Sequence, residues 1–203
     1  MLVVGLTGSL AAGKSTVANL FKRLGAQIFD ADESVHQLLA RRGLCFKPVV
    51  RQFGLEILTK GSIDRKKLAQ IVFNDPSKLK KLTKIIHPAV KAEIRRKIKK
   101  LRRRKGVLML EIPLLFETGC DYYTDINIVV KSTRAQQIRR AIQKFHVTPQ
   151  ECQRRLRAQM PLKNKIRLAD IIIDNSRALI QTKERVKKVW QKLNRIVTHQ
   201  NNH

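Results

Sequence analysis

The sequence predicts an α/β fold whose core is a parallel sheet of five strands between layers of helices. Two observations predict this class: five short runs of almost continuous apolar residues, and longer segments of helical character between them. A strand that is apolar on both faces must be covered on both faces, which is typical of parallel sheets flanked by helices. The five runs lie at residues 2–7, 26–29, 107–112, 126–130 and 171–173.

Helical segments separate these runs. After the first run, Val17, Phe21 and Leu24 recur at helical spacing, and Gly25 is a typical helix stop. A mostly helical stretch follows the second run, and a basic helical stretch follows the fourth. Breaks in the first of these stretches are predicted at Gly43, Gly54, Gly61 and the pairs Asp75-Pro76 and His87-Pro88.

The composition excludes several classes of protein. With 43% hydrophobic and 29% charged residues, the chain is expected to be globular rather than disordered. No apolar run approaches the ~20 residues that cross a bilayer, and the first residues lack the basic leader of a signal peptide. We therefore expect a cytoplasmic protein. Cys45, Cys120 and Cys152 lie far apart, which argues against a zinc ribbon or a disulfide framework.

The formal net charge of +28 is unusually high, and it can steer polyanions such as ATP toward the protein. Nine of the eleven residues at 95–105 are basic. A nucleic-acid surface is one interpretation, but bases are usually held by interleaved aromatic side chains, and this run contains none. The simpler interpretation is a solvated helix face, and nucleic acid is not expected as a partner.

A phosphate-binding loop follows the first apolar run. The pattern Gly-x-x-x-x-Gly-Lys-Ser, between a strand and an amphipathic helix, is the Walker A motif. Its glycines allow close approach of the backbone to phosphate, Lys14 reaches the β- and γ-phosphates, and the Ser15 hydroxyl binds Mg²⁺. A chance match or a merely structural turn is the alternative. The predicted ATP-binding residues here are Gly8, Ala11, Ala12, Gly13, Lys14, Ser15 and Thr16.

Two aspartates end the second predicted strand, at the edge of the sheet where parallel α/β folds bind ligands. A carboxylate there can accept the proton of a hydroxyl that attacks the γ-phosphate. An N-cap is the structural alternative. Asp30 fits the cap better, and Asp32 fits the general base better.

Glu111 ends the third predicted strand, near the place where P-loop proteins hold an acidic residue close to the metal. After Pro113, an apolar run of three residues can line a cleft or belong to the core, and composition leaves both open. In the basic stretch at 132–169, an arginine can stabilise the transferred phosphoryl group. Sequence pattern does not choose among Arg134, Arg139, Arg140, Arg154, Arg155 and Arg157.

From about residue 2 to residue 176 the chain resembles the dephospho-CoA kinase family. The matching segments are Gly5-Leu6-Thr7-Gly8, Asp30-Ala31-Asp32, Ile63-Asp64-Arg65 with Leu68, Val72-Phe73, His87-Pro88, Ile112 to Glu117, Gln137 to Arg140, Arg155 with Gln159-Met160, Ala169-Asp170 and Asp174-Asn175. The resemblance implies a three-layer P-loop kinase fold and transfer of the ATP γ-phosphate to the ribose 3′-hydroxyl of dephospho-CoA, with ATP and Mg²⁺.

The resemblance also implies one kinase domain over residues 1–203 and a role for particular residues. The core is expected at about 1–31, 106–131 and 170–200, the helical acceptor-binding region at about 32–105, and the lid at about 132–169. The implied catalytic residues are Asp32 as general base, Lys14 as phosphate clamp and Arg140 at the transition state. The residues implied to bind the acceptor are Asp32, Arg65, His87, Pro113, Leu114, Leu115, Phe116 and Glu117. Asn175 is implied to lie beside adenine. Mg²⁺ is implied to be held by the Ser15 hydroxyl and, through water, by Glu111.

The sequence departs from the family pattern at three places. Ser9 and Ala11 replace inner glycines of the loop, which predicts a stiffer loop, and Glu111 stands where many members have aspartate. Ser176-Arg177 follows Asn175 where a glycine often comes, so adenine contacts through that turn are open.

Two alternatives are another P-loop kinase with a different acceptor and a nucleic-acid-binding ATPase. The first alternative does not account for the segment at 113–117. The second would use the basic run at 95–105, and it predicts ATP hydrolysis that polynucleotide stimulates, with an affinity that falls steeply as salt rises. A monomer or a weak oligomer is expected.

Overall fold

The structure is a computed structural model that describes residues 1–145 and 147–199. It contains two compact units, Met1–Asp30 together with the chain from Lys97 onward, and Ala31–Arg96. The elements of the first unit are β1 (Leu2–Gly8), α1 (Lys14–Arg23), β2 (Gln27–Asp30), β5 (Val107–Glu111), η2 (Cys120–Tyr123), β6 (Ile126–Lys131), α6 (Arg134–Phe145), α7 (Pro149–Arg157), α8 (Leu162–Arg167), β7 (Ile171–Asp174) and α9 (Leu179–His199).

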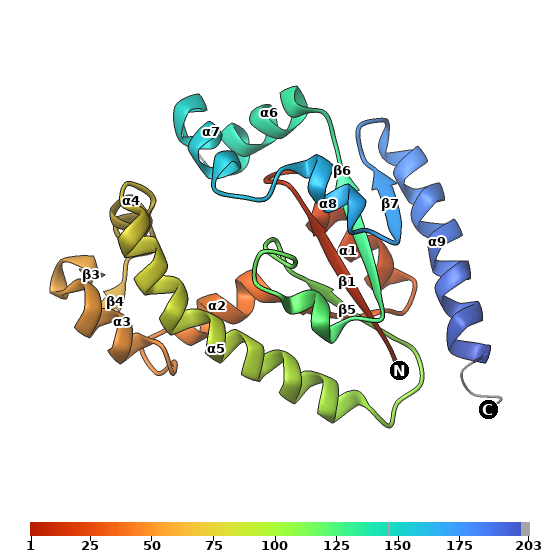
Figure 1. Cartoon of the computed structure of the whole chain (residues 1–203), viewed down its shortest axis with the longest axis horizontal. Helices are drawn as coiled ribbons and strands as arrows, with labels where there is room; N and C mark the ends of the chain where they lie inside the picture. The colour runs from red at the N-terminus through yellow and green to blue at the C-terminus, as the bar shows by residue number, and fades with distance from the viewer. Residues whose placement is uncertain (146, 200–203) are drawn as a thin grey trace. The chain divides into compact units, whose positions relative to one another are not determined.

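The first unit is built on a five-stranded parallel sheet with the strand order β2-β5-β1-β6-β7 (Figure 1). All five strands expected from the apolar runs are present, so the predicted α/β class is confirmed. Every residue of β1 and β5 is buried, which explains why these strands have continuous rather than alternating apolar patterns.

One face of this sheet packs against α1 and α9. Alternate residues of each strand point to this face, where they meet Phe21 of α1 and Val186 of α9. Figure 1 shows α9 (blue) running along the sheet next to β7. The cluster consists of Leu2, Val4, Leu6, Ala12, Val17, Ala18, Phe21, Ala26, Val107, Met109, Ile128, Val130, Ile173, Val186 and Leu193.

The glycine-rich loop follows the central strand β1 and leads directly into α1. Its neighbours are β5 on one side and β6 on the other. In a parallel sheet all strands end at the same edge, so the residues after β1, β5 and β6 are brought together there. This edge holds the candidate site of the first unit.

The second unit is mostly helical, as expected, but it also contains a small hairpin. Its elements are α2 (Ala31–Leu39), α3 (Phe46–Phe53), η1 (Leu55–Ile57), β3 (Leu58–Thr59), β4 (Ser62–Ile63), α4 (Arg65–Phe73) and most of α5 (Pro76–Leu101), which continues into the first unit. The antiparallel pair β3–β4 turns through Lys60 and Gly61, both with positive φ. Such backbone angles define the tight turns that suit a two-residue hairpin loop.

One of the predicted helix breaks is wrong. The Asp75-Pro76 pair does mark a boundary, since the Asp75 carboxylate accepts hydrogen bonds from the backbone N–H groups of Ser77 and Lys78 at the start of α5. At His87-Pro88, however, α5 continues without interruption and contains Pro88 in its interior. Proline removes one backbone donor from a helix, but a 26-residue helix has enough other hydrogen bonds to continue past it.

Candidate active site

The glycines of the phosphate loop are required by its geometry. Gly13 has a φ of +98°, and a Cβ atom there would lie 1.9 Å from Asn175 Nδ2. A Cβ atom at Gly8 would lie 2.3 Å from the backbone oxygen of Val130. Gly13 is the N-cap of α1 and provides no side-chain cap. The first N–H groups of α1 therefore point toward the loop, where they can bind an anion.

Ala11 has a strained backbone conformation. It has a φ of +54°, in the left-handed region that a Cβ atom disfavours by about 1–2 kcal/mol. The sequence marks this residue as a replacement for a glycine of the family pattern. Glycine adopts this conformation more easily than alanine. The stiffer loop expected from the replacement stays a prediction.

Lys14 and Ser15 open α1 at the loop. The ammonium group of Lys14 donates to the backbone oxygens of Gly8 and Ser9, both at 3.1 Å, so its side chain lies over the loop. The hydroxyl of Ser15 donates to Glu111 Oε1 at 2.8 Å. The two residues predicted to hold the metal are thus in direct contact.

The surroundings of Glu111 fit a magnesium ion. Glu111 is buried at the end of β5, next to Leu6 of β1 in the sheet register and next to Asp30 of β2. A hydroxyl and a carboxylate are the hard oxygen ligands that Mg²⁺ prefers, with water and phosphate oxygens completing its octahedron. Within the described part of the chain no three His, Cys, Asp or Glu side chains form a metal-binding group, and this type of site needs only one or two protein ligands.

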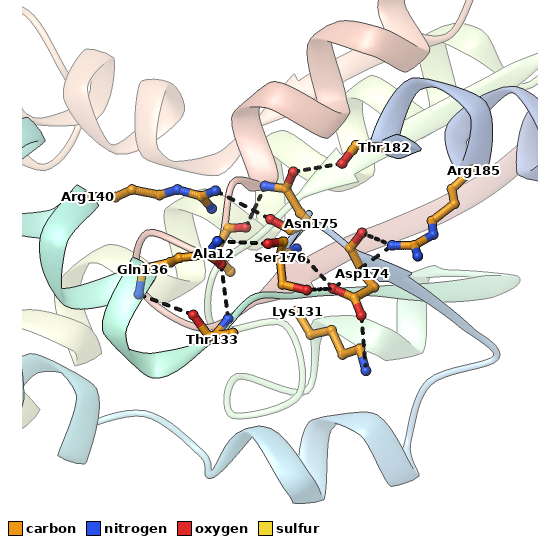
Figure 2. A network of polar contacts seen from close by, with 10 residues as sticks. All are labelled: Ala12, Lys131, Thr133, Gln136, Arg140, Asp174, Asn175, Ser176, Thr182 and Arg185. Carbon is orange, nitrogen blue, oxygen red and sulfur yellow. Dashed lines mark hydrogen bonds and ion pairs between the residues drawn. The ribbon is translucent and has the colours of Figure 1, made fainter. Parts of the chain in front are cut away.

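Asn175 is the centre of a hydrogen-bond network that contacts the loop (Figure 2). Its Nδ2 donates to the backbone oxygen of Ala12 at 2.9 Å, and its Oδ1 accepts from Thr182 at 3.0 Å. Its backbone N–H donates to the oxygen of Lys131 at 2.8 Å. Because the side chain is buried and uses both ends of its amide, it holds the loop in place.

Asp174 fixes the turn that follows β7. It forms ion pairs with Lys131 at 3.4 Å and Arg185 at 4.0 Å, and it accepts a hydrogen bond from the backbone N–H of Ser176 at 2.9 Å (Figure 2). Burial raises the pKa of the Asp174 carboxyl, but the hydrogen bonds from Ser176 and the charge of Lys131 outweigh this effect, so the pKa lies below its ordinary value. The turn that lacks the family's glycine is therefore held by a charged side chain.

Arg140 of α6 lies next to Gly13 of the loop. Its Nη2 donates to the backbone oxygen of Asn175 at 3.4 Å (Figure 2), and a Cβ atom at Gly13 would lie 3.7 Å from its Nη1. Nη1 is buried, and no residue that the structure describes accepts a hydrogen bond from it. A buried guanidinium donor without an acceptor is costly, and a phosphate oxygen would satisfy it. Arg155 of α7 forms an ion pair with Glu151 at 2.6 Å.

The segment from Pro113 to Glu117 follows β5 at the same edge of the sheet. Leu115 is fully buried, and its Cδ2 would lie 2.7 Å from a Cβ atom at Gly5, so this leucine packs in the core. Pro113, Leu114 and Phe116 are half-buried. The side chain of Glu117 pairs with Lys165 at 2.9 Å.

Lys165 and Gln159 were missed as site residues by the sequence reasoning. Lys165 is fully buried and contacts the segment after β5, and Gln159 accepts a hydrogen bond from the backbone N–H of Leu10 in the loop at 3.1 Å. Lys165 is one of 43 basic residues, and no local pattern distinguishes it. Gln159 was noted only as part of the family pattern, which is the one sequence signal that marks it.

The other predicted site residues belong to the second unit. Asp32 lies in the first turn of α2, directly after Asp30 and Ala31, and Arg65 opens α4 behind its N-cap Asp64. His87 is half-buried in α5; burial, and to a lesser extent the charge of Lys91, lowers the pKa of its imidazole and so favours the neutral form. The roles of Asp32, Arg65 and His87 stay predictions.

The sheet, the glycine loop and the helix behind it define a P-loop kinase fold. A family model described as dephospho-CoA kinase matches residues 2–181. The dephospho-CoA kinase of Symbiobacterium thermophilum is 41% identical over 193 residues, which cover 94% of this chain and 81% of the relative, and that of Aquifex aeolicus is 42% identical over 95% of this chain and 97% of the relative. The structure of dephospho-CoA kinase from Campylobacter jejuni is similar with a TM-score of 0.70 and 30% identity, covering 94% of this chain and 96% of that one.

This chain therefore belongs to the dephospho-CoA kinase family, and it is an ATP-dependent kinase. The resemblance inferred from the sequence motifs is confirmed, as is the P-loop kinase fold. No helix among residues 1–145 and 147–199 is long and apolar enough to span a bilayer.

Proposed function

We propose that this chain transfers the γ-phosphoryl group of ATP to the 3′-hydroxyl of the ribose of dephospho-CoA, giving CoA and ADP. The chain belongs to the dephospho-CoA kinase family, and the observation that carries this proposal is how its side chains are arranged around the phosphate loop. A glycine loop, a Ser15–Glu111 pair and the buried Nη1 of Arg140 lie at one edge of the sheet.

The loop binds the phosphates of ATP through its backbone. The first N–H groups of α1 and the ammonium group of Lys14 provide the donors and the positive charge. On nucleotide binding, Lys14 exchanges the backbone oxygens of Gly8 and Ser9 for the β- and γ-phosphate oxygens. The hydrogen bond from Asn175 to Ala12 holds the loop in its conformation, next to the predicted position of adenine.

Magnesium would be held by the hydroxyl of Ser15 and, through water, by the carboxylate of Glu111. When bound, the ion neutralises charge on the β- and γ-phosphates. Since Ser15 and Glu111 contact each other at 2.8 Å, the chain holds both ligands close together before the ion binds.

Arg140 stabilises the transferred phosphoryl group. Charge spreads over the equatorial oxygens of this group in the transition state, where a charge-assisted hydrogen bond from a guanidinium is strongest. The Nη1 atom lies beside Gly13 and lacks an acceptor among the described residues. Nη1 of Arg140 can therefore donate a hydrogen bond to a phosphate oxygen without first breaking another one.

Asp32 acts as the general base in this proposal. The 3′-hydroxyl gives its proton to the Asp32 carboxylate as its oxygen bonds to the γ-phosphorus, while the bond to the β–γ bridging oxygen breaks and ADP leaves. The proposed acceptor-binding residues are Asp32, Arg65, His87, Pro113, Leu114, Phe116 and Glu117. Leu115, also expected to contact the acceptor, is fully buried and packs in the core behind this segment instead. A cytoplasmic location and a monomer or weak oligomer remain predictions of the sequence.

The test is the release of ADP from ATP and Mg²⁺ by the purified chain with different acceptors. Dephospho-CoA is compared with adenosine, AMP, shikimate and duplex DNA. Turnover that is selective for dephospho-CoA supports the proposal. Activity on another acceptor, or ATP hydrolysis stimulated by DNA, contradicts it.

A further inference from the structure

A buried lysine joins α8 to the segment that follows β5. Among the described residues, Lys165 is the one lysine or arginine that is buried, with 0% exposure. Its Nζ donates to the backbone oxygen of Pro113 at 2.8 Å and to Glu117 Oε1 at 2.9 Å. One side chain thus contacts both ends of the five-residue segment Pro113–Glu117.

Both acceptors of Lys165 have a second donor close to the phosphate loop. The backbone oxygen of Pro113 also accepts from the hydroxyl of Thr7 at 3.1 Å, one residue before the loop. Oε1 of Glu117 also accepts from the backbone N–H of Met160 at 2.9 Å. The preceding residue, Gln159, accepts a hydrogen bond from Leu10 of the loop. The chain from Gln159 to Lys165 therefore contacts the loop and the segment after β5 at once.

Stability alone is a poor reason for such a pair. Burial lowers the pKa of Lys165, because the charged ammonium loses its hydration, while the hydrogen bond and charge of Glu117 raise it in part. The Lys165 side chain is fully buried, whereas that of Glu117 keeps 18% of its exposure. Taking an ammonium out of water costs several kcal/mol, and an apolar side chain of similar size at such a position is often as stable. The pair instead restricts the conformation of Pro113–Glu117, because an ammonium that is bonded to both ends of this segment allows it few arrangements.

We propose that Lys165 and Glu117 are positioning residues that fix Pro113–Phe116 relative to the phosphate loop. Glu117 acts through its ion pair with Lys165 rather than by contacting the acceptor, which revises its expected role as a substrate ligand. This inference rests on the proposed function, because the acceptor that the segment positions is dephospho-CoA. Small displacements of such a segment are costly, since catalysis depends on reacting atoms that are closely aligned.

The test is a cycle of three variants: Lys165→Met, Glu117→Gln and the double variant. For each one, Tm is measured together with kcat and the KM values for ATP and dephospho-CoA. Lys163→Met is the matched control, because Lys163 is exposed on the same helix. We expect Glu117→Gln to lower Tm the most, because it leaves the fully buried Lys165 ammonium without its ionic partner, and we expect the double variant to recover most of that loss.

In the double variant, kcat/KM should stay low even though Tm recovers. We expect kcat/KM for dephospho-CoA to fall by on the order of tenfold or more in all three variants, with KM for ATP unchanged. The effects on kcat/KM should not multiply in the double variant, because both residues act through one contact. If a single variant does not fold, the double variant carries the test against the wild-type chain and the Lys163→Met control.

Two results overturn the inference. Recovery of kcat/KM together with Tm in the double variant means that the pair serves stability only. Effects of the two single variants that multiply mean that Glu117 contacts dephospho-CoA independently of Lys165. A wild-type chain that does not turn over dephospho-CoA overturns the proposed function instead, so the two failures are distinguishable.

Discussion

Arg140 gives the most specific prediction at the scale of single residues. The variant Arg140→Ala should lower kcat by on the order of 10²–10³-fold and change KM much less, because the contact strengthens as charge develops in the transition state. Steady-state kinetics with ATP and dephospho-CoA measure this split. Arg139→Ala is the matched control, since Arg139 is exposed on the same helix. A change in KM alone would make Arg140 a binding residue.

Asp32 gives a second prediction at this scale. The variant Asp32→Asn should lower kcat by on the order of 10²–10⁴-fold, the usual range for a lost general base, while ATP binding measured by calorimetry stays close to wild type. Glu33→Gln changes a neighbouring exposed carboxylate in the first turn of α2 and should have little effect. Normal turnover of Asp32→Asn would exclude this residue as the base.

Residue-scale inference from the sequence succeeded where a motif fixed the position. Ser15 belongs to the loop and Glu111 ends a strand, so the shared edge of a parallel sheet brings them together, and the structure has them in contact. Lys165 has no such marker, because its importance comes from being buried between α8 and the segment after β5. Burial of this kind depends on the tertiary fold and leaves no local signal.

At the scale of elements, the phosphate loop contains one strained residue, Ala11, and glycine at this position should relieve the strain. Ala11→Gly should raise the free energy of unfolding by about 0.5–1 kcal/mol, because glycine adopts a φ of +54° without the steric cost that alanine has. Thermal and denaturant unfolding measure it. Ala12→Gly is the control: this residue is buried and does not have a positive φ, so it should lower stability. A loss of stability in Ala11→Gly would contradict the strain.

The elements that the sequence predicted well are those with a long, consistent pattern. The five strands were found because each is a continuous apolar run bounded by loops. The hairpin β3–β4 was missed, since strands of two residues are too short to show any periodicity. The break expected at His87-Pro88 was wrong because the rest of a long helix outweighs one missing donor.

At the scale of the whole molecule, the net charge of +28 predicts a dependence on salt. Like charges repel one another more in the compact folded state than in the unfolded chain, and ions screen this repulsion. Tm should therefore rise as NaCl increases from about 20 mM to about 300 mM, a range over which the Debye length shortens severalfold. Differential scanning calorimetry measures it.

The control for the salt effect is the variant Lys14→Ala. Anions that bind specifically at the loop would also raise Tm, and this variant weakens that site while it removes only one of 43 basic residues. We expect the same dependence on salt in the variant and the wild-type chain. A Tm that falls or stays constant with salt would contradict the repulsion.

The most direct test of the proposed function is the position of the transferred phosphate. ³¹P NMR and mass spectrometry of a reaction with ATP, Mg²⁺, dephospho-CoA and the purified chain identify the product. The proposed mechanism predicts a new phosphomonoester on the ribose 3′-oxygen, formed in equal amount with ADP. Phosphate on another hydroxyl group, or ADP without a phosphorylated acceptor, would contradict it.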